Sequence, residues 1–169
     1  MNPSLLIRPA TPADALCIAV LGMQVFLDTY ATKGVWPSLA REAAGDFSAA
    51  TIEQQMAQPG AFFLVAEQGD CLLGFAHLFV SAKRAGEFVV TRLYVQEPFT
   101  GKGVGKALLD AAEKLVRDKA GSAISLTAWA ENARARAFYE RQGYDDVGPS
   151  TYTFENDSYP TRRFLKRLS

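Results

Sequence analysis

The stretch TGKGVGKALLDAAEKL, residues 100–115, places three glycines at alternate positions directly before an Ala- and Leu-rich segment. Glycine is a poor helix former, so its repetition here needs a separate reason. The first N–H groups of a helix have no partner within the helix, and the helix dipole makes that end positive. Glycines let a phosphate approach the backbone, and Lys102 and Lys106 add positive charge. The stretch predicts a phosphate site, whereas a lone glycine would indicate only a tightly packed turn.

Two other phosphate-binding motifs do not fit these glycines. A P-loop needs glycine, four residues and then Gly-Lys-Ser/Thr, but Ala107 follows Lys106 here. A GxGxxG dinucleotide fingerprint needs a further glycine where Lys106 or Leu108 stands. Neither motif therefore identifies the phosphate-containing ligand of this turn.

Hydrophobic periodicity around the glycines predicts an α+β chain. Helices are expected from residue 11 to about 30, over 39–60 as one or two short helices, and over 104–119 and 133–142. Strands are expected over residues 5–10, 61–67, 71–82, 87–95, 123–130, 150–155 and 162–168. The order implies a mixed, mostly antiparallel central sheet flanked by helices, with a strand–helix–strand unit over 87–130. No repeat or linker indicates a second domain, so we expect a single domain over residues 1–169.

Composition narrows the class of protein. The chain has 169 residues, with 18 Lys plus Arg and 18 Asp plus Glu, and this balance argues against a nucleic-acid partner. Cys17 and Cys71 belong to no metal-ligand pattern, so we expect no metal and two small core residues in a reducing compartment. We find no apolar run of membrane-spanning length and no signal peptide, so the sequence predicts a cytoplasmic protein without a membrane partner.

A third pattern joins the glycine turn to a later helix. RLYVQEPFTGKGVGKALL (92–109) and WAENARARAFYERQGY (129–144) together resemble the GNAT superfamily of acetyl-CoA-dependent N-acetyltransferases. The order of elements agrees with that superfamily over nearly the whole chain. FxxTY at residues 26–30 resembles its branch of bacterial polyamine acetyltransferases. One departure is Thr100, where the family usually has Gln or Arg, but a side chain there is not what binds phosphate.

The resemblance implies a binding role for backbone groups on both sides of the turn. The end of the strand at Leu93, Tyr94 and Val95 would pair with the pantetheine arm of acetyl-CoA and hold the thioester carbonyl. Asn132 is a helix N-cap by its position alone, and the resemblance adds a contact with the pantetheine amides. The residues whose N–H groups would grip the pyrophosphate are Gly101, Lys102, Gly103, Val104, Gly105 and Lys106.

The resemblance also implies a general acid, and the chemistry needs a base. Tyr139 lies on the same helix face as Asn132, two turns later, and either packs against the sheet or gives a proton to the departing thiolate. A phenol stays protonated at neutral pH. Glu87 opens the strand 87–95 and shares a face with Thr91, so it is the candidate base, with a solvated carboxylate as the alternative. His77, the only histidine, ranks below Glu87 and is expected to be structural.

The position of the base in the ribosomal-protein N-terminal acetyltransferase branch is Thr127 here, which argues against that branch. The acceptor pocket of the superfamily follows the first strand, where carboxylates could attract a cationic amine and aromatics could line the pocket, or could simply be solvated or packed. These residues are Asp28, Glu42, Asp46, Tyr30 and Trp36.

The leading hypothesis is transfer of acetyl from acetyl-CoA to a primary amine of a small molecule such as a polyamine or amino compound. The amine would attack directly in a ternary complex, without a cysteine intermediate. The alternatives are acetylation of a protein or peptide amine and a non-catalytic acyl-CoA-binding sensor. A homodimer is left open.

Overall fold

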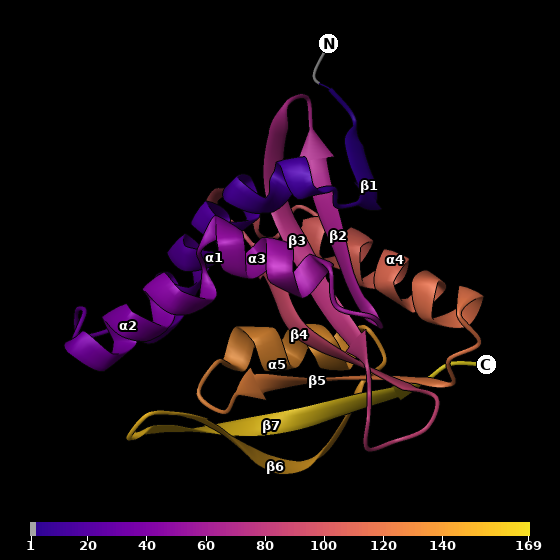
Figure 1. Ribbon diagram of the computed structural model, residues 1–169. Helices are drawn as coiled ribbons and strands as arrows, with labels where there is room; N and C mark the ends of the chain where they lie inside the picture. Colours follow the sequence, from indigo (N-terminus) through magenta and orange to yellow (C-terminus); the bar gives the residue numbers. More distant parts are fainter. Residues whose placement is uncertain (1–2) are drawn as a thin grey trace. The chain divides into compact units, whose positions relative to one another are not determined.

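The structure is a computed structural model that describes residues 3–169 (Figure 1). The helices are α1 (Ala15–Tyr30), α2 (Pro37–Asp46), α3 (Ala49–Met56), α4 (Val104–Asp118) and α5 (Ala133–Arg141). The strands are β1 (Leu5–Pro9), β2 (Ala61–Gln68), β3 (Cys71–Val80), β4 (Glu87–Val95), β5 (Ala123–Trp129), β6 (Asp145–Phe154) and β7 (Asp157–Arg167).

Within the described residues, the strands form a seven-stranded sheet in the order β1-β2-β3-β4-β5-β7-β6. β4 pairs with β5 in parallel, as the predicted strand–helix–strand unit requires. β1 pairs with β2, β5 with β7 and β6 with β7 in antiparallel fashion. The α+β class and the mixed, mostly antiparallel sheet are confirmed.

The chain divides into two compact units. The first unit contains the chain through His77 together with Arg92–Ala112, and the second contains Leu78–Thr91 and Glu113–Ser169. In the first unit, Ile18, Ile52 and Phe75 are fully buried in one apolar cluster, and a second cluster surrounds Phe47. The buried core residues of the second unit include Phe88, Val116, Ile124, Leu126 and Phe164.

Local chemistry explains where several elements begin and end. The Ser48 side chain accepts a hydrogen bond from the Thr51 N–H and caps α3, so the predicted region 39–60 resolves into two helices. Gly69, with a φ of 63°, lies in the short turn between β2 and β3. At Gly74, a Cβ would lie 2.5 Å from the Tyr94 carbonyl oxygen, so only glycine lets β3 run this close to the end of β4.

The hairpin of β6 and β7 is longer than the sequence predicts. The strands expected over residues 150–155 and 162–168 leave NDSYP (156–160) between them, but β6 begins at Asp145 and β7 at Asp157. The two strands pair continuously across this region, from Phe154 opposite Asp157 to Thr151 opposite Pro160. Polar residues and a proline are typical of a loop, but the pairing of this segment with β6 overrides that preference.

Two further predictions need correction. Cys17 and Cys71 are both exposed rather than in the core, although neither forms a disulfide. The segment Pro12–Tyr30, which includes α1, is long and apolar enough to cross a membrane by length and composition, contrary to our reading of the sequence. Several of its apolar side chains, Ile18 and Phe26 among them, are buried in the first unit, which is also what a core helix of a globular protein requires.

Candidate active site

The glycine-rich turn leads into α4 in the first unit. Gly101 and Gly103 have φ angles of 72° and 84°, which residues with side chains rarely adopt. At both positions, no heavy atom outside the glycine and its two chain neighbours lies within 4 Å of the place that a Cβ would occupy. The Ala107 N–H donates to the Gly103 carbonyl over 2.9 Å, so the three N–H groups after Gly103 precede the first intrahelical bond. The backbone is uncovered where a helix N-terminus concentrates donors, which fits a diphosphate.

The two lysines of the turn have different surroundings. Lys106 forms an ion pair with Asp110 one helical turn later, and both side chains are exposed. The Lys102 Nζ lies 5.8 Å from the centroid of the Phe99 ring. Asp110 therefore already balances the charge of Lys106. The main-chain N–H groups are then the main donors that the turn offers to an anion.

The end of β4 lies beyond the register that joins β4 to β5. The register of β4 with β5 joins Glu87–Val90 to Ala123–Leu126, and Leu93, Tyr94 and Val95 lie beyond it. These three residues are half-buried. Burial raises the pKa of Tyr94 to about 12, against the opposing effect of Arg92, so its phenol stays neutral. A stretch of this kind can pair with an added extended chain through its main-chain groups.

In the second unit, Asn132 caps the helix α5 and Tyr139 lies within it. The Asn132 side-chain oxygen accepts a hydrogen bond from the Ala135 N–H over 3.0 Å, which confirms the N-cap prediction. Tyr139 is only 8% exposed, and its ring centroid lies 5.6 Å from that of Phe164 and 6.1 Å from that of Tyr144. The predicted packing of Tyr139 is found, and its role as an acid stays a prediction.

Glu87 is buried and bound by two donors. It is 5% exposed, and its Oε1 accepts hydrogen bonds from the Ser125 hydroxyl over 2.5 Å and from the Arg163 guanidinium over 2.6 Å. Arg84 lies 3.7 Å away. Burial raises the pKa of Glu87, but the hydrogen bonds from Ser125 and Arg163 and the charges of Arg163 and Arg84 together hold it below its usual value.

This environment contradicts the prediction that Glu87 is solvated and disfavours the prediction that it is the general base. The alternative prediction, a solvated carboxylate at the end of the strand, is wrong. The Glu87 side chain is buried and is bound by Ser125 and Arg163. A carboxylate with a depressed pKa also accepts protons weakly, which disfavours general-base catalysis. Arg163 and Phe164 are neighbours on β7, so Glu87 and Tyr139 contact opposite faces of that strand.

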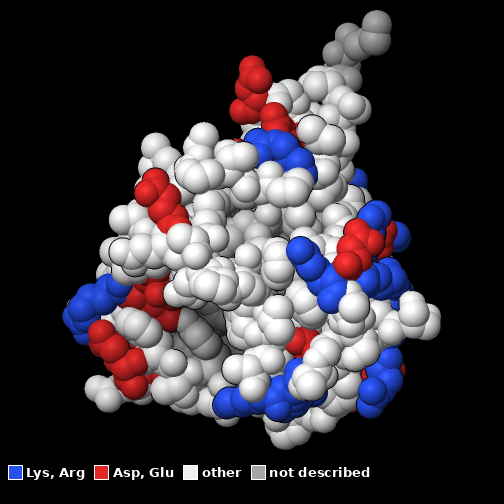
Figure 2. All heavy atoms as spheres, turned by 45° about the vertical axis from the view of Figure 1, so that its right-hand side comes forward, with Lys and Arg blue, Asp and Glu red and all other residues white. Residues whose placement is uncertain are grey.

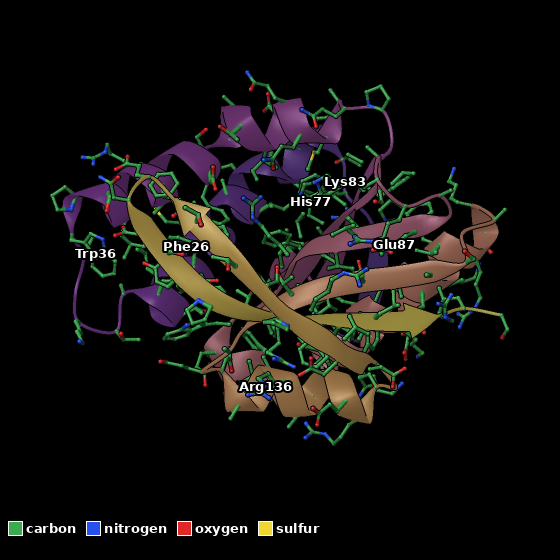
Figure 3. All side chains as sticks on the ribbon, turned by 90° about the horizontal axis from the view of Figure 1, so that it is seen from below. Phe26, Trp36, His77, Lys83, Glu87 and Arg136 are labelled. Carbon is green, nitrogen blue, oxygen red and sulfur yellow. The ribbon has the colours of Figure 1, made fainter. Side chains whose placement is uncertain are left out.

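Figure 3 agrees with this separation within the second unit. It shows Glu87 on β4 and Arg136 on α5, on either side of β5 and β7. Glu87 is therefore not on the side of the sheet that α5 covers. Thr91, which alternation places on the same strand face as Glu87, is exposed.

We expect Glu87→Gln to lower the free energy of unfolding at pH 7 by about 1–3 kcal/mol, because it leaves Arg163 without its anionic partner. The folded-state pKa of Glu87 is depressed, so its contribution is complete above the unfolded pKa of about 4.3 and is lost as pH falls through the folded pKa. Urea unfolding of both proteins at pH 7 and below pH 4 measures this. A variant as stable as the parent at pH 7, but with its acidic pH–rate limb abolished, would instead identify Glu87 as the base.

His77 has the surroundings of a structural residue. Its ring stacks on Phe63 with centroids 4.1 Å apart and an interplanar angle of 11°. Burial lowers the pKa of His77 to about 4, and the charge of Arg92 acts in the same direction. The imidazole is therefore neutral at pH 7, as the structural expectation requires.

Arg92 is an organising residue that the sequence reading missed. It is on β4, and its guanidinium carbon lies 4.6 Å from the centroid of the Phe47 ring. It donates to the Gln55 side-chain oxygen over 3.2 Å and to the Asp46 carboxylate over 3.4 Å. A single charged residue within an apolar strand was the available signal, but its partners are 37 and 46 residues away in sequence.

The five residues proposed for the acceptor pocket differ in burial and in their partners. Tyr30 and Trp36 are half-buried against the Phe47 cluster, as the packing alternative holds. Glu42 is buried and Asp46 is paired with Arg92. The fifth residue, Asp28, is exposed.

Metal ligands and surface charge bear on other classes of site. Among residues 3–169, no group of three or more His, Cys, Asp or Glu side chains could hold a metal ion. On the face drawn in Figure 2, acidic and basic side chains occur among each other rather than as one field of a single sign.

Comparisons with known proteins identify the family. Residues 28–144, well over half of the chain, match the acetyltransferase (GNAT) family. The chain is 28% identical over 153 residues to an aminoglycoside N(6')-acetyltransferase type 1 from Stenotrophomonas maltophilia, covering 86% of this chain and 90% of that protein. It is 32% identical over 95 residues to a spermidine N(1)-acetyltransferase from Thermoplasma acidophilum, covering 55% and 57% of the two chains.

The fold also has close counterparts among solved structures. The PaiA N-acetyltransferase from Thermoplasma acidophilum, solved in complex with coenzyme A, superimposes with a TM-score of 0.75 at 21% identity, covering 98% of this chain and 99% of that one. The chain therefore belongs to the acetyltransferase (GNAT) family and is an acetyl-CoA-dependent N-acetyltransferase.

Proposed function

We propose that residues 1–169 act as a single N-acetyltransferase domain that acetylates a primary amine of a small molecule. The observation that carries this proposal is the uncovered main chain at Gly101 and Gly103, at the start of α4. It provides backbone donors where an anionic cofactor needs them. The absence of a cysteine near this turn in the sequence supports direct attack by the amine in a ternary complex.

The residues of the turn and strand would hold the donor. Acetyl-CoA supplies an activated acetyl group as a thioester. The N–H groups of residues 101–106 bind its diphosphate, and Leu93, Tyr94 and Val95 pair with its extended arm through their main chain. The cap formed by Asn132 uses only the side-chain oxygen, so a donor role for the side-chain amide is compatible with it.

Tyr139 is the proposed general acid. Its hydroxyl holds the proton that the leaving thiolate needs, and its ring is fixed by the packing against Phe164 and Tyr144. The ion pair with Arg163 disfavours Glu87 as the base, and that role stays a prediction. Loss of a proton from the acceptor ammonium to solvent is the alternative that Glu87→Gln distinguishes.

The acceptor is proposed from the relatives. One is named for an aminoglycoside and another for spermidine, and both ligands are small molecules with several amines. Acetylation of a protein or peptide amine is the second candidate, although no specific observation favours it. We expect the protein to act in the cytoplasm.

An acetyl-CoA turnover screen tests this function. It would compare spermidine and other polyamines, amino acids, aminoglycosides and short peptides by release of free thiol. We expect saturable turnover with at least one small polyamine or aminoglycoside. Turnover with peptides alone would contradict the small-molecule acceptor, and binding of CoA without turnover of any amine would indicate a sensor.

A further inference from the structure

One face of β5, β7 and β6 in the second unit carries a row of aromatic side chains. Trp129 lies directly opposite Thr161, and Tyr152 directly opposite Tyr159. The ring centroids of Trp129 and Tyr159 are 6.5 Å apart at an interplanar angle of 88°, and those of Tyr152 and Tyr159 are 6.1 Å apart. Residue alternation places this row on the face opposite Phe164, against which Tyr139 of α5 packs.

The Thr161 hydroxyl in this row lacks a partner. Thr161 is 4% exposed, and its Oγ1 is buried without a hydrogen bond to any described residue. Leaving a buried hydroxyl unsatisfied costs about 1–3 kcal/mol, so an unpartnered oxygen within a regular sheet needs an explanation. Valine would fill the same space in a strand without this cost. The hydroxyl therefore points to ligand binding and not to stabilisation of the fold.

The arginine that follows Thr161 on this face of β7 is neutralised by an ion pair. Arg163, the next residue of β7 on the same face, is bound to Glu87, so the guanidinium does not stand as an isolated positive charge. Rings of Trp and Tyr attract cations, and a hydroxyl oxygen accepts a hydrogen bond from an ammonium group. The two together favour a positively charged nitrogen as ligand.

We propose that Thr161 is a specificity-determining residue that binds a second, non-reacting ammonium group of the acceptor, against the rings of Trp129 and Tyr159. This inference rests on the proposed acetyltransferase function and narrows its acceptor to a diamine or polyamine. The hydroxyl is covered, so the ligand reaches it only when a neighbouring side chain shifts. Trp129 is directly opposite and half-buried, and we assign this movement to it.

The test compares Thr161→Val with Thr161→Ser, using spermidine and 1-aminobutane as acceptors. The two amines share a reacting primary amine, but only spermidine has further nitrogens. We expect Thr161→Val to raise the KM for spermidine roughly tenfold and to change that for 1-aminobutane less than twofold. Thr161→Ser, which keeps the hydroxyl, should stay close to the parent. Equal effects on both amines, or no effect on either, would overturn the proposal.

A second readout does not depend on turnover. The chain has two tryptophans, so 5-fluorotryptophan labelling gives two fluorine resonances, which Trp36→Phe and Trp129→Phe assign. With CoA present, spermidine should shift the Trp129 resonance in both proteins, but the half-maximal shift in Thr161→Val should need roughly tenfold more spermidine than in the parent. A Trp129 resonance that spermidine leaves unmoved in the parent refutes the site even if another amine is acetylated. Failure of the protein to bind CoA would instead refute the proposed function.

Discussion

Tyr139→Phe is expected to lower kcat by about 10²–10³-fold while the dissociation constant for CoA changes less than twofold. The substitution removes only the hydroxyl, and the ring keeps its packing against Phe164 and Tyr144. A thiolate that must leave without a positioned proton donor leaves more slowly, whereas cofactor binding in the proposed site uses main-chain groups and the Asn132 side chain. Steady-state kinetics with the best acceptor from the screen, together with calorimetric titration of CoA, separate the two effects.

Tyr144→Phe is the matched control, because Tyr144 is also a buried tyrosine of the second unit. Its hydroxyl donates to the Glu113 carboxylate over 3.1 Å, so its loss should reduce stability by about 1–3 kcal/mol without a comparable effect on kcat. If Tyr139→Phe and Tyr144→Phe lower kcat equally, Tyr139 has only a packing role. A kcat for Tyr139→Phe within fivefold of the parent would also rule out the acid role.

The double substitution Gly101→Ala and Gly103→Ala is expected to raise the dissociation constant for CoA by roughly 10–100-fold. Both residues have positive φ, and a methyl group would occupy space that is open in the structure and that the diphosphate needs. Alanine also strains a left-handed backbone, so the turn would relax and its N–H groups would lose their alignment. Calorimetric titration of CoA measures the change.

Gly148→Ala controls for backbone strain. Gly148 has a φ of 126°, and nothing lies within 4 Å of a Cβ built there, but it belongs to β6 in the second unit. It should lower stability without changing CoA affinity. Thermal unfolding of all variants shows whether each remains folded at the titration temperature. An unchanged CoA affinity in the folded double variant would contradict the assignment of the turn.

The sequence predicted the parts of the site that depend on local chain geometry. The alternation of Gly101, Gly103 and Gly105 before an apolar segment predicts a turn that leads into a helix, and α4 begins at Val104. Phosphate binding at this turn stays a prediction. Asn132 was predicted as an N-cap because its type and position are sufficient for that role. Such features involve residues within one or two turns of each other, so a linear pattern records them.

Features that depend on distant partners could not be predicted in this way. The carboxylate of Glu87 accepts hydrogen bonds from Ser125, 38 residues away, and from Arg163, 76 residues away. Thr161 is one threonine among several in the sequence, and only the pairing of β7 with β5 and β6 shows its buried hydroxyl. The polar composition around Pro160 suggested a loop, because the register that holds it in a strand is set by neighbouring strands.

Calorimetric titration of the unmodified protein with CoA and with pantetheine tests the central claim most directly, because pantetheine keeps the extended arm and lacks the diphosphate together with the adenosine 3′-phosphate attached to it. If the main-chain amides at the start of α4 bind the diphosphate, CoA should bind saturably with one site per chain, and pantetheine at least about tenfold more weakly. No heat of binding with CoA, or equal affinity for both ligands, would contradict the account.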